Sequence, residues 1–317
     1  SALSSDFSIE GKNYAVFQAI MNFRSKPNGR LYDKIIALQK HFHGWIEMYR
    51  FIARAAAGCL IASTVFAADS ASVSRYVDQY LARQPVQSFK DITTADEAYA
   101  FQQQMNSVLV DRGYEPIGYK LGLTGSKRLF GAPEPLYGRI FDFMQRDNNA
   151  RIPLSDFVRP LVELELAFRF KQDVIPPVDV KQLRQAIDVV APAVELADMV
   201  FENPKTLSWQ QLAASGVGPR RVIIGPPQPL DDLDLNAVQV KAIWNGEFYS
   251  RGYGRNVMGD QWQALLFLAE RLNDQGLRIK SDDWVITGAM NRMLPARAGD
   301  YQVTYTGLGE LTFSLTE

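Results

Sequence analysis

Cysteine and histidine are almost absent from this 317-residue sequence. Cys59 is the single cysteine, so no disulfide can form within the chain, and its apolar neighbours indicate a small hydrophobe. His41 and His43 both precede a segment with the features of a signal peptide. Cys59 lies inside that segment. A mature chain that lacks the segment and everything before it would have no cysteine or histidine nucleophile, no histidine base and none of the usual zinc ligands. Acid–base chemistry is then left to Asp, Glu, Lys or Tyr.

An excess of charge of either sign is also lacking. The formal net charge is -1, with 22% charged and 47% hydrophobic residues. This composition is ordinary for a globular protein and supplies enough apolar material for a core. No overall field would draw the chain to nucleic acid or to an anionic membrane, so we expect neither as a partner.

No apolar run is long enough for a comfortable membrane span of about 20 residues. From Met48, two arginines precede an apolar run over residues 55–66, which small residues follow. This order is typical of a secretory signal peptide, here residues 48–67. Val65 and Ala67 fit the small-residue positions of a signal-peptidase site. We therefore expect cleavage after Ala67, a secreted or periplasmic protein, and no stable membrane span after cleavage.

Residues 1–47 precede this segment, although a signal peptide should open a chain. We interpret them as an upstream extension that is foreign to the natural protein. The alternative is a genuine helical extension, because residues 14–23 and 31–45 have helix-like apolar spacing around a turn at 26–29.

The remainder of the chain shows helical spacing first and strand-like patterns afterwards. Amphipathic spacing predicts helices over residues 73–83 and 95–112, the second opened by a capping sequence at 94–97. A small N-terminal helical region over residues 68–117 follows. Strands are predicted at 118–123, 162–170, 221–224, 238–244, 284–287 and 301–305, with helices at 180–189 and 262–273. The pattern favours an α+β fold whose core, over residues 118–317, is a curled sheet.

Three glutamates stand out as candidate metal ligands. Glu163 and Glu165 alternate with apolar residues, which places both carboxylates on one face of a strand. Glu195 lies in the otherwise apolar stretch 191–198, where an acid needs a partner. A divalent cation with oxygen ligands would offset the repulsion between them. Two alternatives stay open: an edge strand whose glutamates face water, and a buried Glu195 paired with an arginine.

Several motifs occur together in a specific order. They are Gly-Tyr-Lys-Leu-Gly-Leu-Thr at 118–124, Tyr-Gly-Arg-Ile-Phe-Asp at 137–142, Glu-Leu-Glu at 163–165, Glu-Leu-Ala-Asp at 195–198, Leu-Pro-Ala-Arg-Ala-Gly-Asp at 294–300 and Gly-Leu-Gly at 307–309. From residue 73 to the end, the chain resembles the 2-keto-4-pentenoate hydratase and 4-oxalocrotonate decarboxylase branch of the fumarylacetoacetate hydrolase superfamily. An ordered set of motifs is more specific than any one motif alone.

The resemblance implies a fold like the C-terminal domain of fumarylacetoacetase, a mixed β-roll or β-sandwich. It implies that Glu163, Glu165 and Glu195 hold Mg²⁺ or Mn²⁺, and that Lys120 and Asp142 handle protons. It also implies a homo-oligomer. A metal that chelates a small 2-keto acid would stabilise the enolate formed in the reaction. Lys120 could move a proton if burial lowers its pKa; its alternative role is to pair with a ligand glutamate.

The sequence departs from the family pattern where substrate is expected. The segment 288–291 lacks the two hydroxyl residues of the family, and residues 215–216 and 219–221 replace its Asp-Asn and Ser positions. Asn291 and Arg220 are the candidate substrate contacts at this end. Arg220 could bind a second substrate carboxylate through its bidentate fork, or it could belong to a solvated surface pair.

Three functions compete. The first is a metal-dependent hydratase or decarboxylase acting on a small 2-oxo-alkenoate or 2-hydroxydienoate. The second is a carbon–carbon hydrolase of the acylpyruvate or fumarylacetoacetate type, which the missing histidine disfavours. The third is a secreted, non-catalytic 2-keto-acid-binding homologue, which the altered 288–291 segment and the predicted export would suit.

Overall fold

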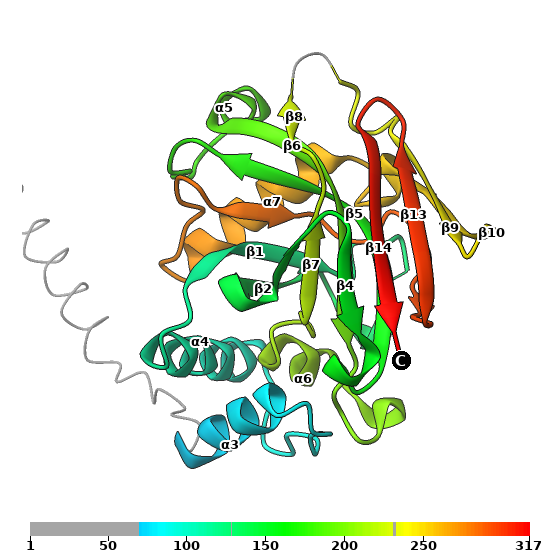
Figure 1. Cartoon of the computed structure of the whole chain (residues 1–317). Helices are drawn as coiled ribbons and strands as arrows, with labels where there is room; N and C mark the ends of the chain where they lie inside the picture. Colours follow the sequence, from blue (N-terminus) through cyan, green and yellow to red (C-terminus); the bar gives the residue numbers. More distant parts are fainter. Residues whose placement is uncertain (1–69, 128, 231–232) are drawn as a thin grey trace, which may run out of the picture. The chain divides into compact units, whose positions relative to one another are not determined.

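The computed structural model describes residues 70–127, 129–230 and 233–317, all within one compact unit (Figure 1). The predicted signal peptide over residues 48–67, the extension over residues 1–47 and Cys59 lie outside the described residues. None of the described helices has the length and apolar character needed to cross a lipid bilayer.

The helical region at the start of the described chain agrees with its prediction. Helices α3 (Ser70–Leu81) and α4 (Ala95–Asp111) form there, and the capping box of α4 is present. Thr94 Oγ1 accepts from the Glu97 N–H, and the Glu97 carboxylate accepts from the Thr94 N–H. The remaining helices and 3₁₀ turns are η1 (Leu129–Gly131), η2 (Asp142–Met144), η3 (Leu154–Asp156), α5 (Val180–Ala186), η4 (Pro204–Thr206), α6 (Trp209–Ala214), η5 (Gly254–Asn256) and α7 (Gln261–Asp274).

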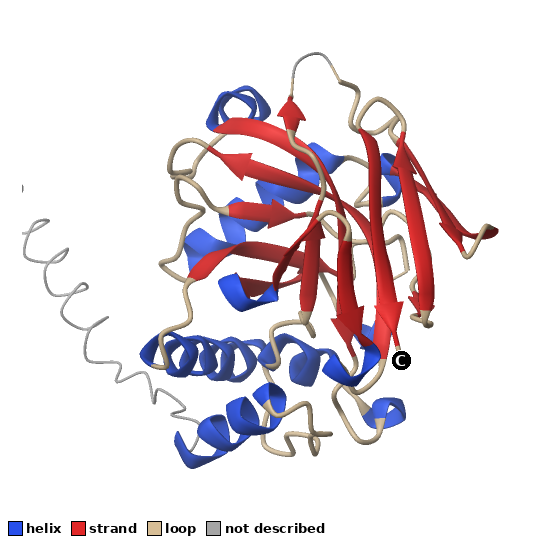
Figure 2. Ribbon diagram, in the orientation of Figure 1, coloured by secondary structure: helices blue, strands red, loops and turns tan. Residues whose placement is uncertain are grey.

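The described strands form two mixed sheets (Figure 2). The larger follows the order β2-β1-β11-β5-β6-β7-β3, with β12 beside β5 and β8 beside β6, and the smaller follows β10-β9-β13-β14-β4. The strands are β1 (Pro116–Gly122), β2 (Leu136–Phe141), β3 (Gln145–Asp147), β4 (Ala150–Pro153), β5 (Pro160–Phe170), β6 (Ile187–Asp198), β7 (Arg221–Ile224), β8 (Gln228–Pro229), β9 (Gln239–Trp244), β10 (Glu247–Tyr253), β11 (Trp284–Ile286), β12 (Leu294–Pro295), β13 (Gly299–Tyr305) and β14 (Gly309–Thr316). The predicted α+β class is confirmed.

Strands β5 and β6 form the longest antiparallel ladder of the larger sheet. Both are almost continuously apolar and buried, as strands covered on two faces are. The helix predicted over residues 180–189 extends too far: α5 ends at Ala186, and β6 begins at Ile187 because pairing with β5 overrides the local spacing. Pro192 is tolerated inside β6 because it falls between the residues that pair with β8 and those that pair with β7.

Candidate active site

The three glutamates meet at the centre of the larger sheet. Glu163 on β5 lies directly opposite Glu195 on β6, and Glu165 follows two residues along β5 on the same face. A carboxylate oxygen from each lies within 4.8 Å of one from each of the others. Glu165 and Glu195 are 0% exposed and Glu163 is 9% exposed. The shared face is as predicted. The alternative in which these glutamates face water on an edge strand is wrong, because β5 is paired on both sides, by β6 and by β11.

Two of these glutamates each have one hydrogen-bonded oxygen and one unpartnered oxygen. Glu165 Oε2 accepts from the Gly288 N–H at 2.7 Å, and Glu195 Oε1 accepts from Lys120 Nζ at 2.7 Å. Glu165 Oε1 and Glu195 Oε2 are buried and have no hydrogen-bond partner among the described residues. A buried carboxylate oxygen in this state is costly. The donor set therefore fits a divalent cation with oxygen ligands, which would occupy both atoms.

The net charge of the three glutamates and Lys120 also fits a divalent cation. Three carboxylates and the Lys120 ammonium leave two formal negative charges, which one divalent cation would neutralise. Burial raises the pKa of Glu195 to about 8, against the opposing effect of Lys120. Burial also raises the pKa of Glu165 well above its ordinary value, and the carboxylates of Glu195 and Glu163 raise it further. These directions belong to the protein without a cation.

Lys120 on β1 is the direct charge partner of this cluster. Its side chain is 1% exposed, and its Nζ donates to Glu195 Oε1 and, at 3.0 Å, to the Val217 carbonyl oxygen. Burial lowers the pKa of Lys120, but the three carboxylates outweigh burial and hold it above its ordinary value. The condition for proton transfer by Lys120, a pKa lowered by burial, is therefore not met without a cation, and its contacts are those of the alternative role as charge partner of a glutamate. The partner of Glu195 is this lysine and not an arginine.

The turn after α6 holds Lys120 in place, and sequence reasoning missed it. Gly216, Val217 and Gly218 have φ angles of +72°, +65° and +67°. This conformation is strained for the β-branched Val217, the residue whose carbonyl accepts from Lys120. A Cβ on Gly138 of β2 would lie 2.0 Å from the Gly216 carbonyl oxygen. The signal was a Gly-Val-Gly tripeptide directly after a helix.

Asp142 and Arg220 are not placed with the triad by any described contact. Asp142 is exposed at the start of η2, and its Oδ1 accepts from two backbone N–H groups. The register sets it beyond the Pro116 end of β1, four residues or about 13 Å along the strand from Lys120. Its proton-handling role stays a prediction, and its contacts are those of a turn cap.

Arg220 is 2% exposed, so its interpretation as a solvated surface residue is wrong. Its Nε and Nη1 donate to the carbonyls of Asp156 and Tyr80, and its guanidinium lies 4.8 Å from the Tyr80 ring centroid. The substrate-binding role stays a prediction. The contacts themselves link the end of α3 to the start of β7.

A cavity of about 580 Å³ adjoins the triad through Gly288 and is lined by three loops. Thr124 packs against Gly288, where a Cβ would lie 2.2 Å from Thr124 Oγ1, and the next residue, Ala289, lines the cavity. The loops are tied together: the Met258 N–H donates to the Thr124 carbonyl, and Asn256 Nδ2 donates to the Met290 carbonyl.

The candidate substrate contact Asn291 also lines this cavity. Its Oδ1 accepts from the Leu164 N–H at 2.8 Å, and its Nδ2 donates to Ser250 Oγ and to the Arg292 carbonyl. Arg255 and Arg292 are exposed in the same lining, which contains no acidic side chain among the described residues. Sequence reasoning missed both arginines, because nothing in the pattern brings residues 255 and 292 together.

No family model matches the chain. It is 30% identical over 224 residues to 4-oxalocrotonate decarboxylase of Pseudomonas sp. (strain CF600), an alignment that covers 69% of this chain and 84% of that protein. It is 29% identical over 224 residues to 2-keto-4-pentenoate hydratase of Paraburkholderia phymatum, covering 69% and 86%. Among solved structures, 4-oxalocrotonate decarboxylase from Pseudomonas putida G7, complexed with magnesium and adipate, superposes with a TM-score of 0.74 at 25% identity, covering 78% of this chain and 96% of that chain.

Proposed function

The chain belongs to the 2-keto-4-pentenoate hydratase and 4-oxalocrotonate decarboxylase family of the fumarylacetoacetate hydrolase superfamily, and from this premise we propose that it is a divalent-metal-dependent lyase. Its substrate is a small 2-oxo-alkenoate or 2-hydroxydienoate, as the names of its relatives suggest. The single observation that carries the proposal is the pair of unpartnered buried oxygens on Glu165 and Glu195, beside Glu163.

In this proposal Glu163, Glu165 and Glu195 hold Mg²⁺ or Mn²⁺. The bound cation supplies Lewis-acid stabilisation of negative charge on the substrate's 2-oxo group. The chain's own residues prepare the site: Gly288 and Lys120 fix one oxygen of Glu165 and one of Glu195, so that the other oxygen of each is available. Burial excludes water and strengthens each of these interactions. Lys120 acts here as a positioning residue.

The cavity beside Gly288 accommodates the remainder of the substrate. Arg255 lies over the Tyr253 ring at 4.3 Å, and Arg292 forms no ion pair with any described residue. Two arginines without an acid in the lining favour a substrate with a second carboxylate at its far end. Asn291 contributes by fixing the loop that carries Arg292, while contact of Asn291 or Arg220 with substrate remains part of the proposal.

The test is metal-dependent turnover. Purified protein is incubated with 2-hydroxypenta-2,4-dienoate or 4-oxalocrotonate, with Mg²⁺ or with EDTA, while diene absorbance and CO₂ release are followed. We expect turnover that requires the metal and is lost in Glu163→Gln. Glu270→Gln, a matched change of an exposed glutamate on α7, should behave as wild type. Full turnover by Glu163→Gln, or turnover unaffected by EDTA, would falsify the proposal.

Export and self-association are also proposed. Residues 48–67 have the pattern of a cleaved signal peptide, and the family resemblance implies a homo-oligomer. Amino-terminal sequencing of the protein from the periplasm would give Ala68 as the first residue. Light scattering would give a mass above that of one chain. An uncleaved cytoplasmic protein contradicts the first statement, and a monomer contradicts the second.

A further inference from the structure

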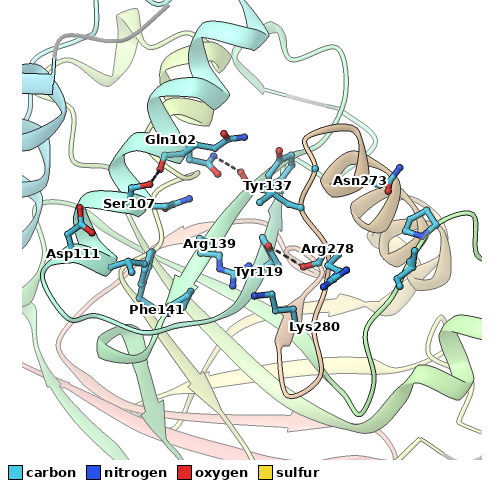
Figure 3. A pocket seen from close by; sticks show the side chains of 18 residues that line it. Gln102, Ser107, Asp111, Tyr119, Tyr137, Arg139, Phe141, Asn273, Arg278 and Lys280 are labelled. Carbon is cyan, nitrogen blue, oxygen red and sulfur yellow. Dashed lines mark hydrogen bonds between the residues drawn. The ribbon is translucent and has the colours of Figure 1, made fainter. Parts of the chain in front are cut away.

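A second cavity lies on the opposite face of β1 from the glutamate triad. Lys120 faces the triad, so the preceding residue, Tyr119, faces the other side of the sheet. On β2, Arg139 lies opposite Tyr119 in the register, and Tyr137 lies two residues away on the same face. These three side chains line a cavity of about 730 Å³ between the β1–β2 pair, α4 and the segment that follows α7 (Figure 3). It is separate from the metal centre.

Two buried polar atoms of this cavity have no partner among the described residues. They are Tyr137 Oη, on a residue that is 3% exposed, and Asn106 Oδ1 of α4. By contrast, the neighbouring Gln102 donates to the Tyr137 and Ala213 carbonyls. Unsatisfied buried groups are uncommon in folded proteins, and here both belong to the lining of one cavity. Tyr137 can donate to a ligand oxygen, and Asn106 Oδ1 requires a ligand donor.

Three cationic side chains line the same cavity, and Asp111 at the end of α4 is the acid in its described lining. The Arg139 guanidinium is largely buried and lies 4.1 Å from the Tyr119 ring centroid, with Asp283 at 4.0 Å. Lys280 is exposed and forms no ion pair with any residue of the described chain. Arg278 lines the same cavity but pairs with Asp173 at 3.0 Å. Lys280 is therefore the cation with free capacity for an anionic ligand, and Arg139, whose contact with Asp283 is longer than that of Arg278 with Asp173, is the second.

We propose that this cavity binds a small organic carboxylate that carries a hydroxyl group and a flat apolar body. Its carboxylate pairs with Lys280 and Arg139, and its hydroxyl accepts from Tyr137 and donates to Asn106 Oδ1. The aromatic rings of Tyr119 and Phe141 contact the apolar body. The volume falls in the range of small-molecule sites, roughly 300–1,000 Å³.

The test uses 4-hydroxybenzoate as the probe and calorimetric titration of the Mg²⁺-loaded protein. Saturating oxalate is added first, because it occupies the metal centre and removes binding there from the measurement. We expect binding of one 4-hydroxybenzoate per chain with oxalate present. Lys280→Met should weaken it about tenfold or more, as the loss of a charge-assisted contact does. Lys241→Met, an exposed lysine of β9 on the other sheet, should leave it unchanged.

The hydroxyl contact has its own measurement. Asn106→Leu should weaken binding of 4-hydroxybenzoate several-fold while leaving benzoate unaffected, because benzoate has no donor for Asn106 Oδ1. The unfolding midpoint of each variant is recorded as a control for folding. Because Lys280 is exposed, we expect Lys280→Met to keep the midpoint of the wild type. The proposal is overturned if wild type does not bind 4-hydroxybenzoate, if oxalate displaces it, or if Lys280→Met binds as tightly as wild type.

Discussion

The proposed metal centre and the cavity that adjoins it are built from different parts of the chain. The glutamates stand on paired central strands, where the register of β5 and β6 sets their separation. The cavity is lined by residues 124–126, 255–256, 258–259 and 289–292, which lie in loops and in the turn η5 and are joined by a few hydrogen bonds. Strand pairing fixes the three carboxylates relative to one another, while loop residues can change without disturbing them. The departures from the family pattern at residues 288–291 lie in or next to these loops, so we expect them to change selectivity and to leave the proposed metal ligands in place.

The largest expected effect, on turnover, follows the substitution of a proposed metal-binding glutamate. Glu165→Gln should lower metal-dependent turnover about a thousandfold, because Lewis-acid stabilisation is worth several kcal/mol. The same change should not lower the free energy of unfolding without metal, since it removes a carboxyl group whose ionisation burial opposes and keeps an oxygen for the Gly288 N–H. Rate measurements and urea unfolding in EDTA check both. A variant that loses activity and is also less stable without metal would show that the glutamates are structural.

The next largest effect is expected for Lys120→Met, which tests whether Lys120 positions the Glu195 carboxylate in the proposed metal centre. The free energy of unfolding without metal should fall by about 1–3 kcal/mol, because Glu195 Oε1 and the Val217 carbonyl oxygen lose their buried donor. With saturating Mg²⁺ we expect a turnover loss of about 10–100-fold, the range for groups that orient metal ligands. If stability is unchanged but the pH profile of turnover loses one limb, Lys120 is a proton-transfer group and not a positioning residue.

A smaller effect, on KM for one class of substrate, is expected from a substitution in the loops that line the cavity. Arg292→Ala should raise KM for the dicarboxylate 4-oxalocrotonate about tenfold, the loss of one charge-assisted contact, and leave KM for a monocarboxylic dienoate nearly unchanged. Arg251→Ala, on the exposed face of β10, is the matched control. Equal changes for both substrates would contradict the assignment of this cavity to the distal carboxylate.

A further expected effect, on stability and not on turnover, is the dependence of the free energy of unfolding on pH. The pKa of Glu195 in the folded, metal-free protein is raised to about 8, against about 4.3 for an unfolded glutamate. The stability from this proton is fully present below the unfolded pKa and is lost as pH rises through the folded pKa. The free energy of unfolding in EDTA should therefore fall from about pH 5 to 8, and Mg²⁺ should reduce the fall. Urea unfolding at several pH values measures it; an unchanged slope in Glu195→Gln would contradict the assignment.

Much of the site could be predicted from the sequence, because the signals were local. Alternation placed Glu163 and Glu165 on one face, and the capping sequence at Thr94 marked the start of α4. The strand β6 could not be predicted. Its first residues continue the helical spacing of α5. Pro192 also argues against a central strand, because only the structure shows that it lies between the residues of β6 that pair with β8 and those that pair with β7. Asp142 shows another limit: the family resemblance implies that it lines the pocket with Lys120, and its position four residues along the β1–β2 pair could not be known from the sequence.

By itself, the sequence determined the chemistry available to this protein. Residues 70–317 contain no histidine or cysteine, so this part of the chain offers a metal mainly oxygen donors, and strand periodicity placed two carboxylates on one face. The tertiary structure alone decided the rest: which residue neutralises Glu195, which oxygens stay free, and which arginines line the cavity. These depend on contacts between residues far apart in the chain, such as Lys120 with Val217 and Glu165 with Gly288. Local propensity carries no information about such pairs, because the pairing of strands and loops creates them only when the whole sheet has formed.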